Sequence, residues 1–100
     1  VMEDGNSVLH VASSKDSAAL IKTLIQNGAD VNARNNAGYT PLMVAAISNT
    51  PYAAYELLQN GADYTATDAT DRTATTLAHA TGNKSVVNAI LTFREQQRAY

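Results

Sequence analysis

The sequence predicts an all-α solenoid of three helix–turn–helix units. The segment Asn-Gly-Ala-Asp occurs at residues 27–30 and again at residues 60–63, which indicates a repeat period of 33. Pairs of apolar residues recur with the same period, and within each unit two such pairs lie four residues apart. A fixed period in this range is typical of stacked repeats, and a spacing of four places apolar side chains on one face of a helix.

Each helix of a unit is expected to begin after a polar side chain that caps the unpaired N–H groups of the first turn. The expected caps are Ser7, Ser17, Thr40, Thr50, Thr73 and Asn83. Pro41 and Pro51 follow two of them, at the first helical position, where the missing N–H costs nothing. Gly28 and Gly61 end second helices, because the residue after a helix commonly adopts the left-handed conformation.

The apolar pairs predict one buried stripe along the second helices. Its members are Leu20, Ile21, Leu24, Ile25, Ala53, Ala54, Leu57, Leu58, Val86, Val87, Ile90 and Leu91. Residues 29–37 and 62–70 are polar connectors, which suits projecting turns or short hairpins. We therefore expect a single domain over residues 1–100, with repeats at 5–37, 38–70 and 71–100, the last ending in a capping helix.

These motifs resemble the ankyrin repeat. Residues 40–46, TPLMVAA, are similar to the signature TPLHxAA with Met in the His place, and residues 7–12, SVLHVA, match it with Ser for Thr and Val for Pro. Residues 27–33, NGADVNA, match the family segment unchanged, and residues 82–87, GNKSVV, follow GHxxVV. The resemblance covers residues 3 to about 94 and implies a protein-binding module.

The third unit departs most from the pattern. Asp71 replaces the turn glycine and Thr75 replaces a core leucine, so this repeat is expected to be the loosest. The Thr75 hydroxyl would need a partner, expected to be a carbonyl one turn back. Residues 92–94 replace the usual helix stop, so the last helix is expected to continue through Arg98 as a polar end to the stack.

The composition excludes several classes of function. A net charge of −2 argues against a nucleic-acid partner, which favours a basic domain. The absence of cysteine excludes disulfides, thiolate zinc sites and thiol catalysis. No apolar run approaches the roughly 20 residues of a membrane span, so no membrane insertion is expected. We expect an isolated domain to be monomeric and cytoplasmic or nuclear, or part of a secreted effector that acts in a host cytoplasm.

The sequence predicts no catalytic residue, no metal site and no cofactor. His10 and His79 are the only histidines, and neither has a metal-ligating residue three or four positions on. The resemblance places His10 at the signature position, which implies a hydrogen bond between neighbouring turns. His79 is expected to pack, half-exposed, and the hydroxyl residues lie at caps rather than in a catalytic triad.

Asn32 has two interpretations. A leucine eight residues earlier and an acid two residues earlier are similar to the pattern that asparaginyl hydroxylases accept in ankyrin proteins. The family also keeps this asparagine for the structure of the turn, so hydroxylation and a structural role both stand. Asp30, Asp63 and Asp68 are expected to hold turns by accepting hydrogen bonds from their own backbone.

The resemblance implies that a partner contacts the turn tips and the exposed side of each first helix, on a concave face. The predicted contact residues are Glu3, Asp4, Asn6, Asn36, Tyr39, Ile47, Ser48, Arg72 and Thr81. Tyr39 and Arg72 are expected to lie side by side, either as binding residues or as a solvated cation–π contact. Tyr52 and Tyr55 are expected to pack over small alanines on the opposite side.

Two other functions remain open. The chain could be a structural spacer in a longer ankyrin array, an interpretation favoured by Val1, which begins midway through what would be a turn. A small hydrolase or metal enzyme would require tight, stoichiometric metal binding.

Overall fold

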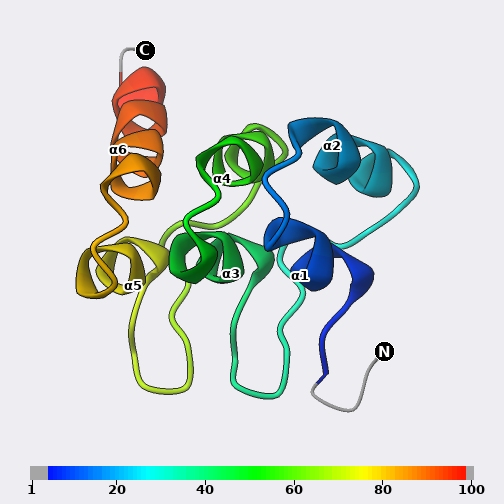
Figure 1. Cartoon of the computed structure of the whole chain (residues 1–100), viewed down its shortest axis with the longest axis horizontal. Helices are drawn as coiled ribbons and strands as arrows, with labels where there is room; N and C mark the ends of the chain where they lie inside the picture. Colours follow the sequence, from blue (N-terminus) through cyan, green and yellow to red (C-terminus); the bar gives the residue numbers. More distant parts are fainter. Residues whose placement is uncertain (1–4, 99–100) are drawn as a thin grey trace.

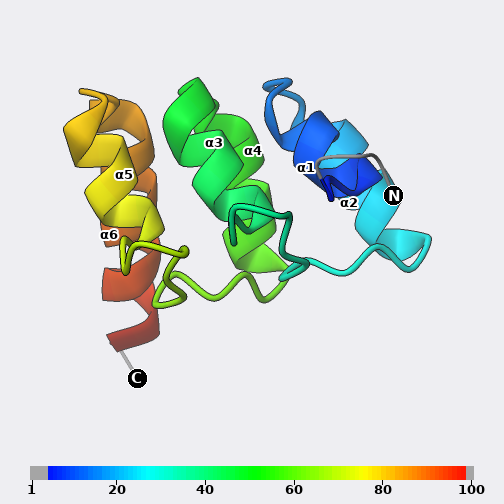
Figure 2. The same cartoon turned by 90° about the horizontal axis from the view of Figure 1, so that it is seen from below.

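A computed structural model describes residues 5–98 of the chain. Within them lie six helices: α1 (Val8–Ser13), α2 (Ala18–Gln26), α3 (Pro41–Ser48), α4 (Pro51–Gln59), α5 (Ala74–Ala80) and α6 (Lys84–Arg98). Figure 1 shows α1, α3 and α5 in one row, with α2, α4 and α6 above them and the two long connectors projecting below. The view from below in Figure 2 shows the same three pairs side by side. The predicted all-α stack is confirmed, and the connectors in residues 5–98 are turns without strands.

The caps of the first helices form as the sequence predicts. The hydroxyl oxygens of Ser7, Thr40 and Thr73 each accept a hydrogen bond from the N–H three residues later, at 3.2–3.3 Å. Pro41 begins α3 and Pro51 begins α4. Equivalent helices begin one repeat period apart, which keeps the three pairs in one register.

The prediction that Thr50 caps its own helix is wrong. Its hydroxyl donates to the Ser13 carbonyl at 2.6 Å, across the boundary between helix pairs. The start of α4 is capped instead by Asp16, whose Oδ1 accepts hydrogen bonds from the N–H groups of Tyr52 (3.0 Å) and Ala53 (3.3 Å). Because α4 begins against the end of α1, the preceding helix pair supplies the polar partner.

The prediction that Asn83 caps its own helix is also wrong. Its amide donates to the Ala46 carbonyl at 2.6 Å and to the Ile47 carbonyl at 3.2 Å. It therefore pairs carbonyl groups near the end of α3, which have no partner within their own helix. Polar residues at the second-helix starts thus join one pair to the next.

The predicted buried stripe is complete in the middle of the stack and incomplete at its ends. Ala53, Ala54, Leu57 and Leu58 are at most 1% exposed. In the first pair Leu20 is exposed and both Leu24 and Ile25 are half-buried, and in the last pair Leu91 is half-buried. A helix between two others is covered on both sides, whereas an end helix is covered on one.

The last pair departs from the predicted repeat pattern at two side chains, and the expectation that the third repeat is the loosest stays a prediction. Its buried apolar residues outnumber those of the first pair: they are Ala74, Leu77, Ala78, Val86, Val87 and Ile90, against Leu9, Ala12 and Ile21. Thr75 is half-buried rather than a core residue, and its hydroxyl makes no hydrogen bond within residues 5–98, so the predicted bond to a carbonyl is wrong. His79 is exposed rather than half-exposed and packed. Both residues lie at the end of the stack, where water can reach their polar atoms. The α6 helix continues to Arg98, as expected.

Candidate partner-binding surface

Two equivalent turns shape the lower edge of the stack. In the first, Asn35 Oδ1 accepts hydrogen bonds from the N–H groups of Ala37 (3.0 Å) and Tyr39 (2.9 Å). In the second, Asp68 Oδ1 accepts from Thr70 and Arg72, both at 2.9 Å. A side-chain oxygen that accepts from backbone groups two and four residues later fixes the turn tightly, so both turns hold their tips in one conformation.

Asp68 is an ionised carboxylate in a nearly buried place. Its Oδ2 lies 3.0 Å from Arg72 Nε. Burial alone would raise the pKa of Asp68, but hydrogen bonds from the Arg72 and Thr70 N–H groups and the Thr70 hydroxyl, with the Arg72 charge, lower it to about 2. The predicted turn-holding role of the aspartates is confirmed here, and also at Asp30 and Asp63, each of which accepts from the N–H two residues later.

Tyr39 is fixed between two helix pairs. His10 Nδ1 accepts the Ser7 N–H at 3.0 Å, so Nε2 carries the hydrogen and donates it to the Tyr39 carbonyl at 2.7 Å. This confirms the predicted His10 bond between neighbouring turns. The Tyr39 hydroxyl accepts from Arg72 Nη2 at 3.3 Å, so the two side chains do lie side by side. Their contact is a hydrogen bond to the hydroxyl and not the cation–π contact considered as the alternative.

A shallow groove of about 340 Å³ runs between α1 and α3, on the side of the stack formed by the first helices. It is lined by Asn6, His10, Val11, Ser14, Asn35, Tyr39, Val44, Ile47 and Ser48. Val11 and Ile47 expose 36% and 39% of their surface, whereas His10 is buried. At one end, the Asn35 amide donates to Asn6 Oδ1 at 2.9 Å. The groove is therefore aliphatic in its walls and amide-lined at its lower end.

The groove unites four predicted contact residues, Asn6, Tyr39, Ile47 and Ser48. It also contains Val11, Ser14, Asn35 and Val44, which the sequence reasoning missed. The repeat register could have found one of them, since Ser14 lies one repeat period before the predicted contact Ile47.

The other predicted contacts lie elsewhere. Arg72 is outside the groove and is held by Asp68 and Tyr39. Asn36 lies on an exposed turn beside Gly5. The Thr81 hydroxyl donates back to the Leu77 carbonyl at 2.8 Å, at the end of α5. Glu3 and Asp4 lie outside the described residues.

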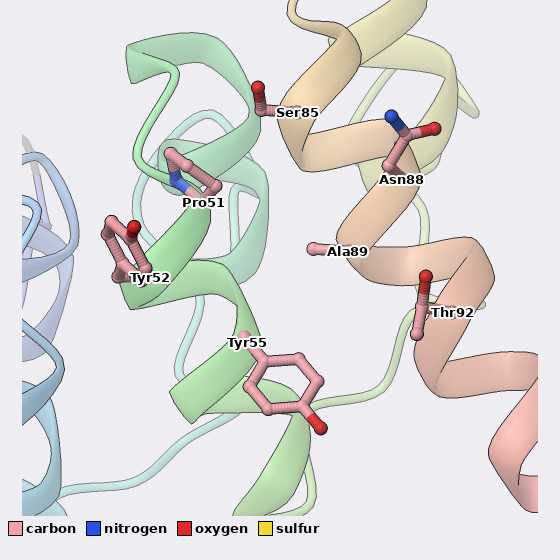
Figure 3. A pocket seen from close by; sticks show the side chains of 7 residues that line it. All are labelled: Pro51, Tyr52, Tyr55, Ser85, Asn88, Ala89 and Thr92. Atoms are coloured by element: carbon pink, nitrogen blue, oxygen red, sulfur yellow. The ribbon is translucent and has the colours of Figure 1, made fainter.

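A second groove lies on the opposite face, between α4 and α6. It measures about 450 Å³, and Figure 3 shows the Tyr55 ring reaching from α4 toward α6. Tyr52 is 70% exposed, so its predicted packing role is wrong; Ala53 and Ala54 are fully buried without it. Tyr55 is half-buried, and its hydroxyl donates to Gln96 Oε1 at 3.4 Å.

The Asn32 side chain joins the two long connectors. Its amide nitrogen donates to the Gly61 carbonyl at 3.2 Å, and its Oδ1 accepts the Asp63 N–H at 2.8 Å. The residue is nevertheless exposed to solvent. This geometry gives Asn32 a structural role, and its hydroxylation stays a prediction.

Within residues 5–98 no group of three or more histidine, cysteine or acidic side chains is placed to hold a metal ion. The same part of the chain contains no helix with the length and apolarity needed to cross a membrane.

The sequence matches the family described as "Ankyrin repeats (3 copies)" over residues 1–68. The chain belongs to the ankyrin repeat family. Ankyrin repeats generally act as protein-binding modules and are typically non-catalytic, and the helix pairs described above have the helix–turn–helix form of this family.

Three relatives illustrate the range of proteins that contain similar repeats. A transient receptor potential cation channel subfamily A member 1 homolog of Caenorhabditis elegans is 38% identical over 85 residues, which are 85% of this chain and 7% of that protein. NF-kappa-B inhibitor delta of Mus musculus is 31% identical, over 88% of this chain and 28% of the relative. Protein phosphatase 1 regulatory subunit 27 of Homo sapiens is 38% identical, over 64% of this chain and 42% of the relative. The chain spans less than half of each.

Proposed function

We propose that this ankyrin domain binds a protein or peptide in the groove between α1 and α3. The observation that carries the proposal is the exposure of Val11 and Ile47 on facing helices of one groove. Exposed aliphatic side chains in a preformed hollow favour burial by a partner, because apolar area removed from water contributes about 25 cal/mol per Å².

The lining also indicates what kind of segment fits. No aspartate, glutamate, lysine or arginine lines the groove, and His10 Nδ1 accepts a hydrogen bond from the Ser7 N–H. A partner that buried a charge there would lose hydration without gaining an opposite charge. The groove therefore suits a segment with a small aliphatic side chain, whose backbone amides can reach the polar side chains at the rim.

Peptides selected from a displayed library on the immobilised chain provide the test. Ile47→Ala and Val11→Ala should each weaken the selected peptides by about 1–3 kcal/mol, since interface energy concentrates in a few central contacts. Tyr52→Ala is the control: Tyr52 is a more exposed aromatic residue that lies outside the groove between α1 and α3, so its truncation is expected to leave the affinity unchanged. Affinity that is sensitive to Tyr52 but indifferent to Ile47 would place the site on the α4–α6 side.

Tyr39 and Arg72 require a finer test than truncation to alanine, because both side chains hold the turns. Tyr39→Phe removes the hydroxyl that accepts from Arg72 and keeps the ring in the groove wall. If the ring contacts the partner, Tyr39→Phe retains most of the affinity while Tyr39→Leu loses it. Equal losses in both variants would assign the effect to the lost hydrogen bond.

A second function is a spacer within a longer ankyrin array, with activity in other domains. It is supported by the partial coverage of the relatives, 7%, 28% and 42% of their lengths. A spacer would select no peptide whose binding depends on Ile47. Imaging of the tagged chain tests the cytoplasmic or nuclear location that we propose with either function.

Hydroxylation of Asn32 is a separate proposal. The side-chain amide is exposed but engaged on Gly61 and Asp63, so the enzyme would have to open these contacts first. Incubation with an asparaginyl hydroxylase, iron and 2-oxoglutarate should add one oxygen at Asn32, detected by mass spectrometry. Thr65, the equivalent residue of the next repeat, is the internal control, because it has no amide. An unmodified Asn32 peptide would exclude the proposal.

A further inference from the structure

The α1/α2 pair lies at one end of the stack, so among the described residues no helix pair covers one of its faces (Figure 1). Val8 on this face is 62% exposed and Leu20 is 40% exposed. The same positions one repeat period later, Pro41 and Ala53, are buried against the preceding helix pair, and so is Ala74 after a further period. The exposed apolar residues Val8 and Leu20 on this face thus lie at positions that stacking covers in the other pairs.

The same face is hollowed. A groove of about 370 Å³ lies between α1 and the end of α2 and is lined in part by Val8 and Leu24. Leu24 is half-buried, whereas Leu57, its equivalent in the middle pair, is fully buried. A second helix pair in the same register would close this hollow.

Unpaired backbone groups form the rim of this groove. In the middle pair, the Asn32 side chain of the preceding unit joins the Gly61 carbonyl to the Asp63 N–H. The equivalent groups of the first pair are the Gly28 carbonyl and the Asp30 N–H, and no hydrogen bond from residues 5–98 reaches either. An asparagine amide supplied from outside would satisfy both.

We propose that this N-terminal face, formed by Val8, Leu20, Leu24, Gly28 and Asp30, binds a further ankyrin repeat joined in register ahead of Gly5. That repeat presents small apolar side chains over Val8 and Leu20 and an asparagine at the position of Asn32. The proposal continues the interface already present between the α1/α2 and α3/α4 pairs. It is independent of the α1–α3 groove, because the two hollows share no lining residue.

A second copy of the chain is a poorer occupant. Stacked end to end, it would bring the outer side of α5/α6 against this face. Thr76 and His79 would then stand where His10 and Ser13 stand in the existing interface, and both are exposed and polar. The α6 helix continues as far as Arg98, so a second copy has no connector at the position from which Asn32 reaches Gly61 and Asp63.

The test extends the chain with its own first repeat, as residues 5–37 followed directly by residues 5–100, which preserves the register and supplies a copy of Asn32. Urea unfolding should remain one transition, with a higher midpoint and an m-value larger by roughly a third, because the m-value scales with the surface exposed on unfolding. Hydrogen exchange at the Asp30 amide of the original repeat should slow by roughly tenfold or more.

Val8→Asp in the original repeat is the matched control. In the 100-residue chain it should be nearly neutral, because Val8 is exposed and an acid suits the first turn of a helix. In the extended chain it should lower the midpoint, since the carboxylate would be buried. An added repeat that unfolds in its own transition, or an equal effect of Val8→Asp in both chains, would overturn the proposal. So would a dimer of the original chain, detected by sedimentation, that Val8→Asp dissociates.

Discussion

The middle and last helix pairs share one register but differ in how well their equivalent residues are protected from water. Leu42 and Leu58 of the middle pair are 1% exposed, whereas their equivalents Thr75 and Leu91 are half-buried. The middle pair has neighbours on both sides, and the last pair has one (Figure 2). Position in the stack therefore decides burial as much as residue type does, and Thr75 is tolerated because water can reach its hydroxyl.

The turns that lead into these two pairs also differ, because the turn before the middle pair has glycine at its left-handed position and the turn before the last pair has aspartate. Gly38 and Asp71 both have left-handed backbone, with φ of 82° and 63°. A Cβ at Gly38 would lie 3.0 Å from the Ala69 nitrogen. Glycine is thus required in the first turn by conformation and by space, whereas the second turn holds a residue with a side chain at a conformational cost.

Truncation of equivalent leucines should give the largest difference in stability between the middle and last pairs. Leu58→Ala is expected to cost about 2–5 kcal/mol in urea unfolding, because it leaves a cavity among fully buried neighbours. Leu91→Ala, the matched change in the last pair, should cost clearly less, since Leu91 already contacts water. Equal losses would show that the end of the stack is as well packed as its middle.

Substitution of the two turn residues should change the stability of the chain in opposite directions. Gly38→Ala is expected to destabilise the chain by about 1–2 kcal/mol, from the left-handed backbone and the approach to Ala69. Asp71→Gly is expected to stabilise it by about 0.5 kcal/mol. Glycine relieves the cost of the left-handed backbone, and part of this gain is offset because glycine also gives the unfolded chain more conformational freedom. Thermal melts of both variants at neutral pH are sufficient. Destabilisation by Asp71→Gly would mean that the Asp71 side chain has a role beyond its backbone.

The two turn acceptors should differ in how they affect stability at low pH, because Asp68 can take up a proton and Asn35 cannot. Because the pKa of Asp68 is lowered to about 2 in the fold, below its ordinary value of 3.8, ionised Asp68 stabilises the chain above about pH 4. That contribution is lost as the pH falls toward 2. Asp68→Asn keeps an oxygen acceptor, as Asn35 does, and should reduce the loss of stability in this range. Urea melts at pH 7 and pH 2.5 measure the difference, and equal acid sensitivity in both proteins would contradict it.

Thr75→Leu should have the smallest effect. A leucine there would bury only part of its surface, so we expect a gain of about 0.5 kcal/mol or less, below the value for full burial. A denaturant melt with the Leu91→Ala variant as the reference measures it. A gain above about 1.5 kcal/mol would mean that the end of the stack closes over the larger side chain.

The period of the sequence predicts the fold almost completely, because both the caps and the apolar pairs repeat with it. What it could not predict is which side chains face a neighbouring unit. Thr50 and Asn83 are good cap residues by type, but the adjacent pair offers carbonyl groups that they pair instead. The candidate site was predicted in part: Tyr39 and Ile47 lie in the groove, whereas Arg72 is withdrawn by its ion pair with Asp68, which residue type does not reveal.

The cap that Asp16 provides for α4 bears on the order in which the repeats can fold during synthesis. Asp16 is synthesised 36 residues before Tyr52, whose N–H it accepts, and the Ser13 carbonyl precedes the Thr50 hydroxyl by 37. A ribosome adds about 5–20 residues per second, so the first helix pair leaves it seconds before α4 is complete. The acceptors are therefore already present when the start of α4 emerges, and the nascent chain can build the stack from its first unit onward.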